Sequence, residues 1–218
     1  GQGGKGLSDD QGRHVPLLIA RAGNRKAIKR GKRTDLCSLL DLPATMLALA
    51  GLPVPDGMES TPLFAPDDKR DYIIATRDRC DWCIDRIRAV RTTRYAYMRN
   101  YITDRPLVQK DYRQRQDYYK TLIGLHAEGK LTAQQAAVLK TPRAAEELYD
   151  LQADPHPIRN LAADPKPAKT LASMRRTLAA WIKQTGDKGQ QPESDQALGV
   201  ILKRWGKRCV NPEFDRLR

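Results

Sequence analysis

The first side chains that could act on an anion lie at the start of the sequence. Lys5 stands in a glycine-rich stretch, 1–12, and His14 follows that stretch closely. Both precede Val15–Ala20, a short and almost uninterrupted apolar run that is typical of a strand buried on both faces. A flexible polar loop that leads into such a strand is where α/β enzymes place reactive groups. A single lysine is more commonly just a solvated side chain, so its meaning depends on the rest of the chain.

Arg77 and Arg79 form a second candidate for anion binding. On an extended segment, side chains two residues apart point to the same side of the strand. Guanidinium groups bind sulfate or carboxylate through parallel N–H donors, so the pair is predicted to form a fork that contacts an anionic substrate. An equally strong alternative is a surface cluster of ion pairs with the neighbouring aspartates Asp78, Asp81 and Asp85.

Cys80 and Cys83 have the spacing of one half of a zinc or redox site. A structural zinc site needs four ligands, and the two other cysteines, Cys37 and Cys209, do not form a second pair at ligand spacing. A thioredoxin-like use needs a strand–helix–strand context, whereas the flanking segments are predicted to be antiparallel strands. The pair is therefore interpreted as packing and turn residues, and no metal ligand is assigned.

The histidines provide no complete catalytic arrangement. His14, His126 and His156 are far apart in the sequence, and none lies beside a serine or cysteine at the spacing of a nucleophile elbow. The sequence also lacks a P-loop and a dinucleotide-binding glycine pattern. Only His14 lies near the candidate loop, and it is a candidate substrate contact together with Arg77 and Arg79.

Two kinds of structure are predicted to position these residues. After the basic loop 24–33, apolar spacing predicts helical structure that ends at Gly51, a residue suited to a left-handed helix end. Alternation with period two predicts antiparallel strands, and an apolar stripe predicts one clear helix over 164–185. The predicted strands cover 71–76, 87–90, 95–101 and 147–152, and further helices cover 111–128 and 132–140.

The charge balance restricts the partners. Lysine and arginine number 39 and aspartate and glutamate 26, giving a net charge of +13 in 218 residues. This charge predicts attraction to polyanions, such as sulfated glycan, anionic lipid or nucleic acid. The absence of a known nucleic-acid-binding motif argues against nucleic acid. No apolar run approaches the roughly 18–20 residues of a membrane helix, so no membrane span is expected.

Four stretches together resemble the C-terminal part of the type I sulfatases. In 5–19, a lysine precedes Gly-x-x-Val-Pro-Leu-Leu-Ile at the spacing found in the family. The second stretch, 38–53, contains the motifs Ser-x-x-Asp-Leu and Thr-x-Leu-x-x-Ala-Gly. The third, 87–100, is similar to a hairpin of the family. The fourth, 147–162, contains Glu-Leu-Tyr-Asp-Leu, Asp-Pro and Asn-Leu-Ala. The resemblance covers about 5–186 and is closest to the heparan N-sulfatase-like branch.

The resemblance implies an alkaline-phosphatase-like α/β fold with a small antiparallel sheet and helix as a subdomain. Residues 1–67 would be the last strand–helix units of the catalytic domain, 68–185 the C-terminal α+β subdomain, and 186–218 a basic, flexible tail. It implies hydrolysis of sulfate esters or N-sulfate groups on a sulfated glycan or aryl sulfate, with a formylglycine nucleophile and a calcium ion. It also implies a periplasmic or secreted enzyme in which Lys5 is catalytic, stabilising charge on the sulfate oxygens.

This chain departs from the family pattern in several places. None of its four cysteines is followed by Pro and Arg at the offsets of the formylglycine motif, and no calcium ligand is identified. Asp9 and His14 stand where the family usually has an aromatic residue and an arginine. We therefore expect the chain alone to hydrolyse nothing. Two alternatives stay open: a basic module that binds polyanions without catalysis, and a pseudo-sulfatase remnant. No signal peptide is visible in the sequence, and the sequence does not indicate an oligomeric state.

Overall fold

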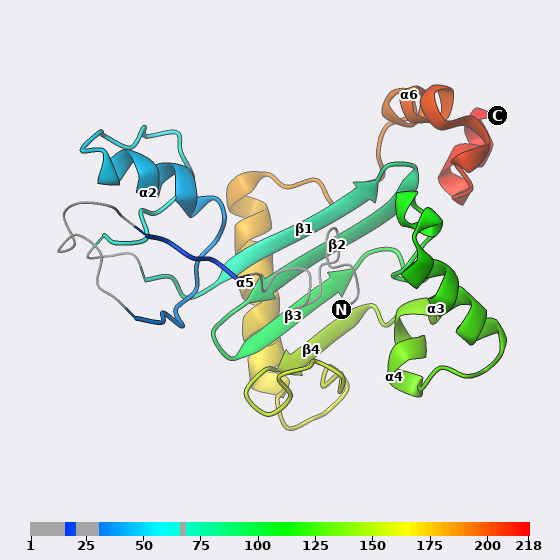
Figure 1. Cartoon of the computed structure of the whole chain (residues 1–218), viewed down its shortest axis with the longest axis horizontal. Coiled ribbons are helices and arrows are strands. Elements are labelled where there is room, and N and C mark those ends of the chain that lie inside the picture. Colours follow the sequence, from blue (N-terminus) through cyan, green and yellow to red (C-terminus); the bar gives the residue numbers. More distant parts are fainter. Residues whose placement is uncertain (1–15, 21–30, 66–68) are drawn as a thin grey trace.

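The centre of the molecule is a four-stranded antiparallel sheet (Figure 1). The computed structural model describes residues 16–20, 31–65 and 69–218. The strands follow one another in space as in sequence, in the order β1-β2-β3-β4. They are β1 (Ile73–Cys80), β2 (Cys83–Arg91), β3 (Tyr95–Asn100) and β4 (Glu146–Asp150). The predicted mixed α/β fold with a small antiparallel sheet is confirmed.

Helix α5 (Ala168–Thr185) lies across one face of the sheet (Figure 1). The register places Val90, Tyr97 and Leu148 opposite one another on adjacent strands, so all three side chains share a face. They pack against the buried stripe of α5, which consists of Leu171, Met174 and Leu178. The apolar stripe predicted for 164–185 is therefore confirmed, and Gly186, with φ of 66°, ends the helix in the left-handed region.

The connection between β3 and β4 contains helical segments within the two ranges predicted to be helical, 111–128 and 132–140. It contains the 3₁₀ turn η2 (Tyr112–Arg115), helix α3 (Asp117–Ala127), the short helix α4 (Ala133–Ala136) and the 3₁₀ turn η3 (Ala137–Leu139). Thr132 and Gln135 form a capping box at the start of α4, which satisfies two backbone N–H groups of that turn.

The last segment of the chain differs from the prediction. Residues 186–218 were expected to be a flexible tail, but 195–217 form helix α6 (Asp195–Trp205) and the 3₁₀ turns η4 (Gly206–Arg208) and η5 (Pro212–Leu217). Leu198, Cys209 and Phe214 are buried in a cluster at the β1–β2 turn, where they pack with Trp82 and Ile84. The prediction of a flexible tail is wrong. The few apolar residues are widely spaced among charged ones, so the sequence shows no clear apolar stripe for the side of the segment that is buried.

Helix α2 (Asp41–Leu49) is anchored to the loop that follows it. The buried Asp41 carboxylate accepts hydrogen bonds from the backbone N–H of Ser38 at 2.7 Å and of Thr61 at 3.1 Å, and it also pairs with Arg70. The Thr45 hydroxyl accepts from the backbone N–H of Leu63 at 2.9 Å. These contacts explain why an aspartate begins this helix, and the predicted end at Gly51, with φ of 73°, is confirmed.

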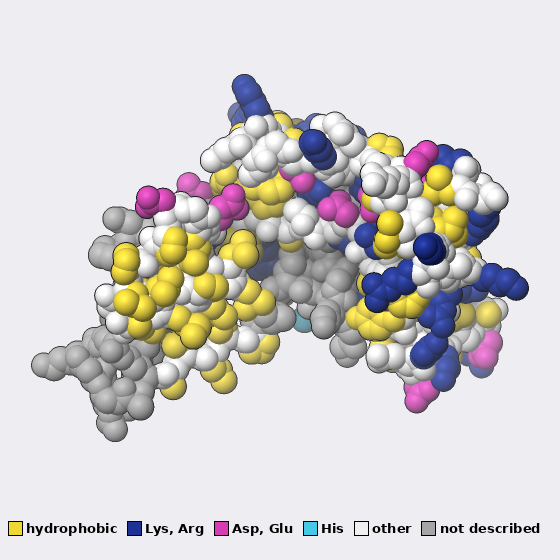
Figure 2. Space-filling model, turned by 90° about the horizontal axis from the view of Figure 1, so that it is seen from above, with side chains coloured by type: hydrophobic (Ala, Val, Ile, Leu, Met, Phe, Trp, Pro, Cys, Tyr) yellow, Lys and Arg dark blue, Asp and Glu magenta, His cyan; other side chains and the backbone are white. Residues whose placement is uncertain are grey.

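The strand predicted for 15–20 is not formed by residues 16–20. They have no regular secondary structure, and the Leu18 side chain is 95% exposed. A strand needs a neighbour to pair its backbone groups, and no described strand lies beside this segment in the sheet order. Figure 2 shows the lobe that contains α2 largely covered by apolar atoms. Exposed large apolar side chains in 16–20 and in 31–65 include Leu18, Leu39, Leu40, Met46 and Leu52.

A second polar network ties α5 to the edge of the sheet. Glu146 of β4 accepts a hydrogen bond from the Tyr97 hydroxyl at 2.6 Å and from Arg175 Nε of α5 at 2.8 Å. The hydrogen bonds from Arg175, assisted by that of Tyr97, lower the pKa of Glu146 from 4.5 to about 2. The carboxylate is therefore more stable in the folded chain than in the unfolded chain.

We expect Glu146→Gln to flatten the acid dependence of stability. A carboxyl whose pKa is lowered on folding contributes stability that is fully present above about pH 4.5 and is lost as the pH falls toward about 2. The wild-type chain should lose stability across this window more steeply than the variant, and the variant should be the less stable at pH 7. Urea midpoints measured from pH 7 to 2 test this, and parallel curves for the two chains would contradict it.

Candidate functional site

The candidate site lies where the β1–β2 pairing becomes irregular. Arg77 pairs with Ile87, but Arg79 pairs with Ile84, so two steps along β1 correspond to three along β2. The extra residue of β2 lies in a bulge next to Asp85. Bulges change the direction of side chains locally, and this one accompanies a buried carboxylate in the middle of a sheet.

Arg77 and Arg143 share the Asp85 carboxylate. Asp85 is fully buried, and the side chains of Arg77 and Arg143 are only 4% and 6% exposed. Arg143 donates through Nη2 and Nη1 to the two carboxylate oxygens at 2.6 and 3.2 Å, whereas Arg77 Nε lies 3.7 Å from Oδ2. Arg77 Nη1 also donates to the Leu107 carbonyl at 3.3 Å. Two buried cations therefore depend on one buried anion.

Burial lowers the pKa of Arg77, and the charge of Asp85 opposes that effect. Within the described residues, the Nε and Nη2 atoms of Arg77 have no hydrogen-bond partner. These donors could hold an oxygen of an anion, but the side chain is almost completely covered in this structure. The role of Arg77 as a substrate contact stays a prediction.

Arg79 binds a different carboxylate, so the two arginines do not form a shared fork. Its Nε lies 3.0 Å from Glu193 Oε1, in the loop before α6, and its Nη1 donates to the Asp81 carbonyl at 2.8 Å. Arg77 instead lies against Asp85. Of the ion pairs in the alternative, only the one between Arg77 and Asp85 is seen among the described residues, and it is buried rather than on the surface; a substrate-binding role for Arg79 stays a prediction.

Arg88 is a structural residue that the sequence reasoning missed. Its side chain is 2% exposed and binds two aspartates: Nη1 lies 2.7 Å from Asp78, and Nε and Nη2 lie 2.8 and 2.9 Å from the two oxygens of Asp187. Gly189 covers the guanidinium so closely that a Cβ atom there would lie 1.6 Å from Nη2. Arg88 stands among apolar residues in β2, and that contrast is the signal that could have marked it as a buried, paired charge.

Cys80 and Cys83 flank the two-residue turn between β1 and β2 and pair with each other in the register. Asp81 takes the first turn position with φ of 51°, a conformation that aspartate tolerates. Cys83 is buried in the cluster with Trp82, and burial raises the pKa of its thiol to about 12. This placement agrees with packing and turn roles. Across the described residues, no group of three or more His, Cys, Asp or Glu side chains could hold a metal ion.

Lys5 and His14 lie outside the described residues, so their positions relative to Arg77 and Arg79 stay predictions. Among the helices that the structure describes, none is both long and apolar enough to cross a membrane.

Sequence comparison gives the relation of this chain to known proteins. No protein-family profile matches the chain. A curated sulfatase is 32% identical to it over 211 residues, which is 95% of this chain. The chain is therefore related to the sulfatases. That relative is the "Ulvan-active sulfatase" of Formosa agariphila, and the chain spans about a third (34%) of its length.

Solved structures share part of the fold. BT1596, described as a 2-O GAG sulfatase, has a TM-score of 0.47 at 24% identity, over 73% of this chain and 28% of that chain. The phosphonate monoester hydrolase of Agrobacterium radiobacter has a TM-score of 0.38 at 19% identity, over 66% of this chain and 24% of that chain. Because both scores lie below 0.5, neither structure supports a statement about activity.

Proposed function

We propose that this chain is the C-terminal portion of a type I sulfatase that hydrolyses sulfate esters or N-sulfate groups on sulfated glycans. The single observation that carries the proposal is the 32% identity to a sulfatase over 95% of the chain. The match to about a third of that relative supports the view that the remaining parts of the reaction centre are supplied by a preceding region. A periplasmic or secreted location belongs to the same proposal.

In this proposal Lys5 is the catalytic contribution of the chain. Its ammonium would stabilise the charge that develops on the sulfate oxygens in the transition state, as a positioned compact cation. His14, Arg77 and Arg79 would contribute to binding the anionic substrate. The formylglycine nucleophile and the calcium ligands would come from outside this chain, because the sequence offers no nucleophile motif and the resemblance assigns none of its residues to the metal.

The exposed apolar surface around α2 supports the same proposal. Leu40, which caps α2, and Met46 within it are 63% and 71% exposed, and Figure 2 shows apolar atoms over much of the lobe that α2 forms. Contiguous apolar surface of this kind is unusual on a protein in water and marks a surface that another part of a protein covers. In the proposed enzyme the covering part would be the rest of the catalytic domain, to which 1–67 would also belong.

A graft tests the function. In the sulfatase of Formosa agariphila, the region that matches this chain would be replaced by the chain, and turnover of an aryl sulfate and of sulfated glycans would be measured. We expect turnover by the graft and none by the 218-residue chain alone. A graft that unfolds cooperatively on heating, yet shows no more turnover than the relative with this region deleted, would contradict the proposal. It would favour the alternative, a module that binds polyanions without catalysis.

A further inference from the structure

Four exposed cations gather at the end of α6 and in η4. They have no carboxylate partner among the described residues, whereas the basic residues that follow, Arg216 and Arg218, pair with Asp195 and Asp215. Two of them lie in the last turn of α6 and two in η4, which follows directly, and one residue of each pair lies over the same ring, Trp205. We call them the α6–η4 basic surface, and they are Lys203, Arg204, Lys207 and Arg208.

Two of these cations are held in place by aromatic rings. The guanidinium of Arg208 lies 5.2 Å from the ring centre of Trp82 and 5.5 Å from that of Trp205, and Arg204 lies 5.1 Å from Trp205. The two tryptophan rings are themselves 5.0 Å apart. Stacking uses the face of a guanidinium and leaves the N–H groups at its edge available to an anion. The two arginine side chains are therefore already ordered before a ligand binds, so that binding loses less side-chain entropy.

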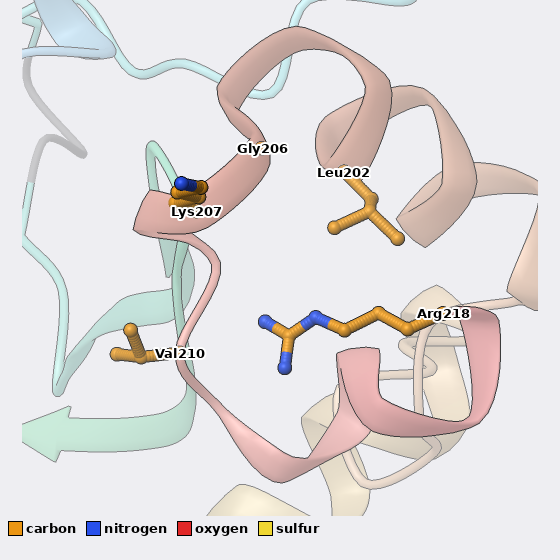
Figure 3. A pocket seen from close by; sticks show the side chains of 5 residues that line it. All are labelled: Leu202, Gly206, Lys207, Val210 and Arg218. Carbon is orange, nitrogen blue, oxygen red and sulfur yellow. The ribbon is translucent and has the colours of Figure 1, made fainter.

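A pocket of about 400 Å³ adjoins this surface (Figure 3). Leu202 and Val210 give it apolar walls, Lys207 contributes positive charge, and Arg218, whose guanidinium pairs with Asp215, also lines it. Figure 3 shows the Arg218 side chain extending between Leu202 and the segment that carries Val210. Cations beside small apolar walls match a ligand that carries anionic groups on a ring with an apolar face.

We infer that the α6–η4 basic surface binds a sulfated polysaccharide chain. Several sulfates along a polymer can contact Lys203, Lys207 and the stacked arginines together, while a sugar ring occupies the adjoining pocket. Figure 2 shows lysine and arginine side chains gathered at the end of the molecule away from the apolar α2 lobe. The choice of a sulfated sugar as the ligand rests on the proposed function.

The aromatic residues disfavour single-stranded nucleic acid as the ligand. Proteins that bind it stack bases on open aromatic faces. Here Trp82 is only 3% exposed, and Trp205 is stacked with Arg204 and Arg208. The surface therefore presents cations rather than rings.

Binding of the 218-residue chain to heparin tests the inference, with completely desulfated heparin and a DNA duplex as comparison ligands. Lys203→Gln/Arg204→Gln/Lys207→Gln/Arg208→Gln should weaken heparin binding on the order of 10²-fold or more at low salt, since each cation near an anionic surface contributes about fivefold. Lys203→Gln/Lys207→Gln, which leaves the stacked arginines in place, should weaken it about tenfold or more. Desulfated heparin should bind only weakly to every chain.

A matched control removes the same charge from α5 and the turn before it, in the variant Lys166→Gln/Lys169→Gln/Arg176→Gln/Lys183→Gln. These side chains are exposed, and the control should weaken heparin binding by less than about fivefold because screening limits distant charges. An equal loss in the control, or tighter binding of DNA than of heparin, would overturn the inference. If the 218-residue chain binds heparin but the graft is inactive, the proposed function is rejected and this inference is not. If the graft is active but the chain does not bind heparin, this inference is rejected and the proposed function is not.

Discussion

Asp85→Ala should destabilise the folded chain by about 3–5 kcal/mol, because it leaves buried cations without their anion. Arg77 and Arg143 are 4% and 6% exposed and face the same carboxylate, so bulk water solvates the two guanidinium groups poorly once it is removed. A loss of this size is a large part of the roughly 5–15 kcal/mol that stabilises a typical domain. Urea unfolding followed by far-ultraviolet circular dichroism measures the effect.

Two further variants separate the loss of the ion pair from other causes. Asp117→Ala removes a carboxylate that is 97% exposed and paired with Lys120, and it should change stability by less than about 0.5 kcal/mol. Arg77→Met/Asp85→Leu/Arg143→Met replaces the whole network with apolar side chains and should recover most of the stability. If Asp85→Ala proves as mild as Asp117→Ala, the three charged groups do not depend on one another as described.

Lys5→Ala should reduce the turnover of the graft on the order of 10²–10³-fold, because a positioned cation at developing charge contributes that much in comparable oxyanion sites. This expectation depends on the proposed function. A transition-state role predicts a fall in kcat with a smaller change in KM, whereas a role in substrate binding alone predicts mainly a rise in KM. Steady-state kinetics on an aryl sulfate distinguish the two results.

One control for this prediction keeps a positive charge at position 5, and the other removes a lysine at a different position. Lys5→Arg keeps a cation but replaces a compact charge with a broad planar one, so it should recover only part of the rate. Lys166→Ala removes an exposed lysine beyond the sheet and should leave the rate unchanged. Equal turnover by the Lys5→Ala graft and the unsubstituted graft would show that Lys5 is not catalytic.

Elements with local patterns could be predicted from the sequence. The apolar stripe of α5 repeats with helical spacing over 18 residues, so its helix and its buried face were both correct. The β2–β3 hairpin was found because alternating residues flank a short turn. The strand at 16–20 failed for the opposite reason, because an apolar run specifies burial only where a neighbour is present to cover it.

The charged contacts could not be predicted because their partners are remote in sequence. Arg79 was expected to bind an anionic ligand, but its carboxylate partner, Glu193, lies 114 residues away. The same holds for Arg88 and Asp187, which are 99 residues apart. Apolar neighbours, as at Arg88, can indicate that an arginine is buried and paired, but the local pattern does not identify a partner from another element. The stacked arginines near Trp205 were likewise visible only as a basic segment.

Neighbouring strands of the sheet are also consecutive in sequence order. The apolar cluster at the β1–β2 turn, in contrast, is completed by residues of 195–217. The backbone N–H of Ile84 donates to the side chain of Asn211 at 2.8 Å across 127 residues. Closing so long a loop costs more entropy than forming the β1–β2 and β2–β3 hairpins, so we expect these hairpins to fold early and 195–217 to dock last. During folding, Trp82 would therefore remain without its apolar cover until Leu198, Cys209 and Phe214 have docked.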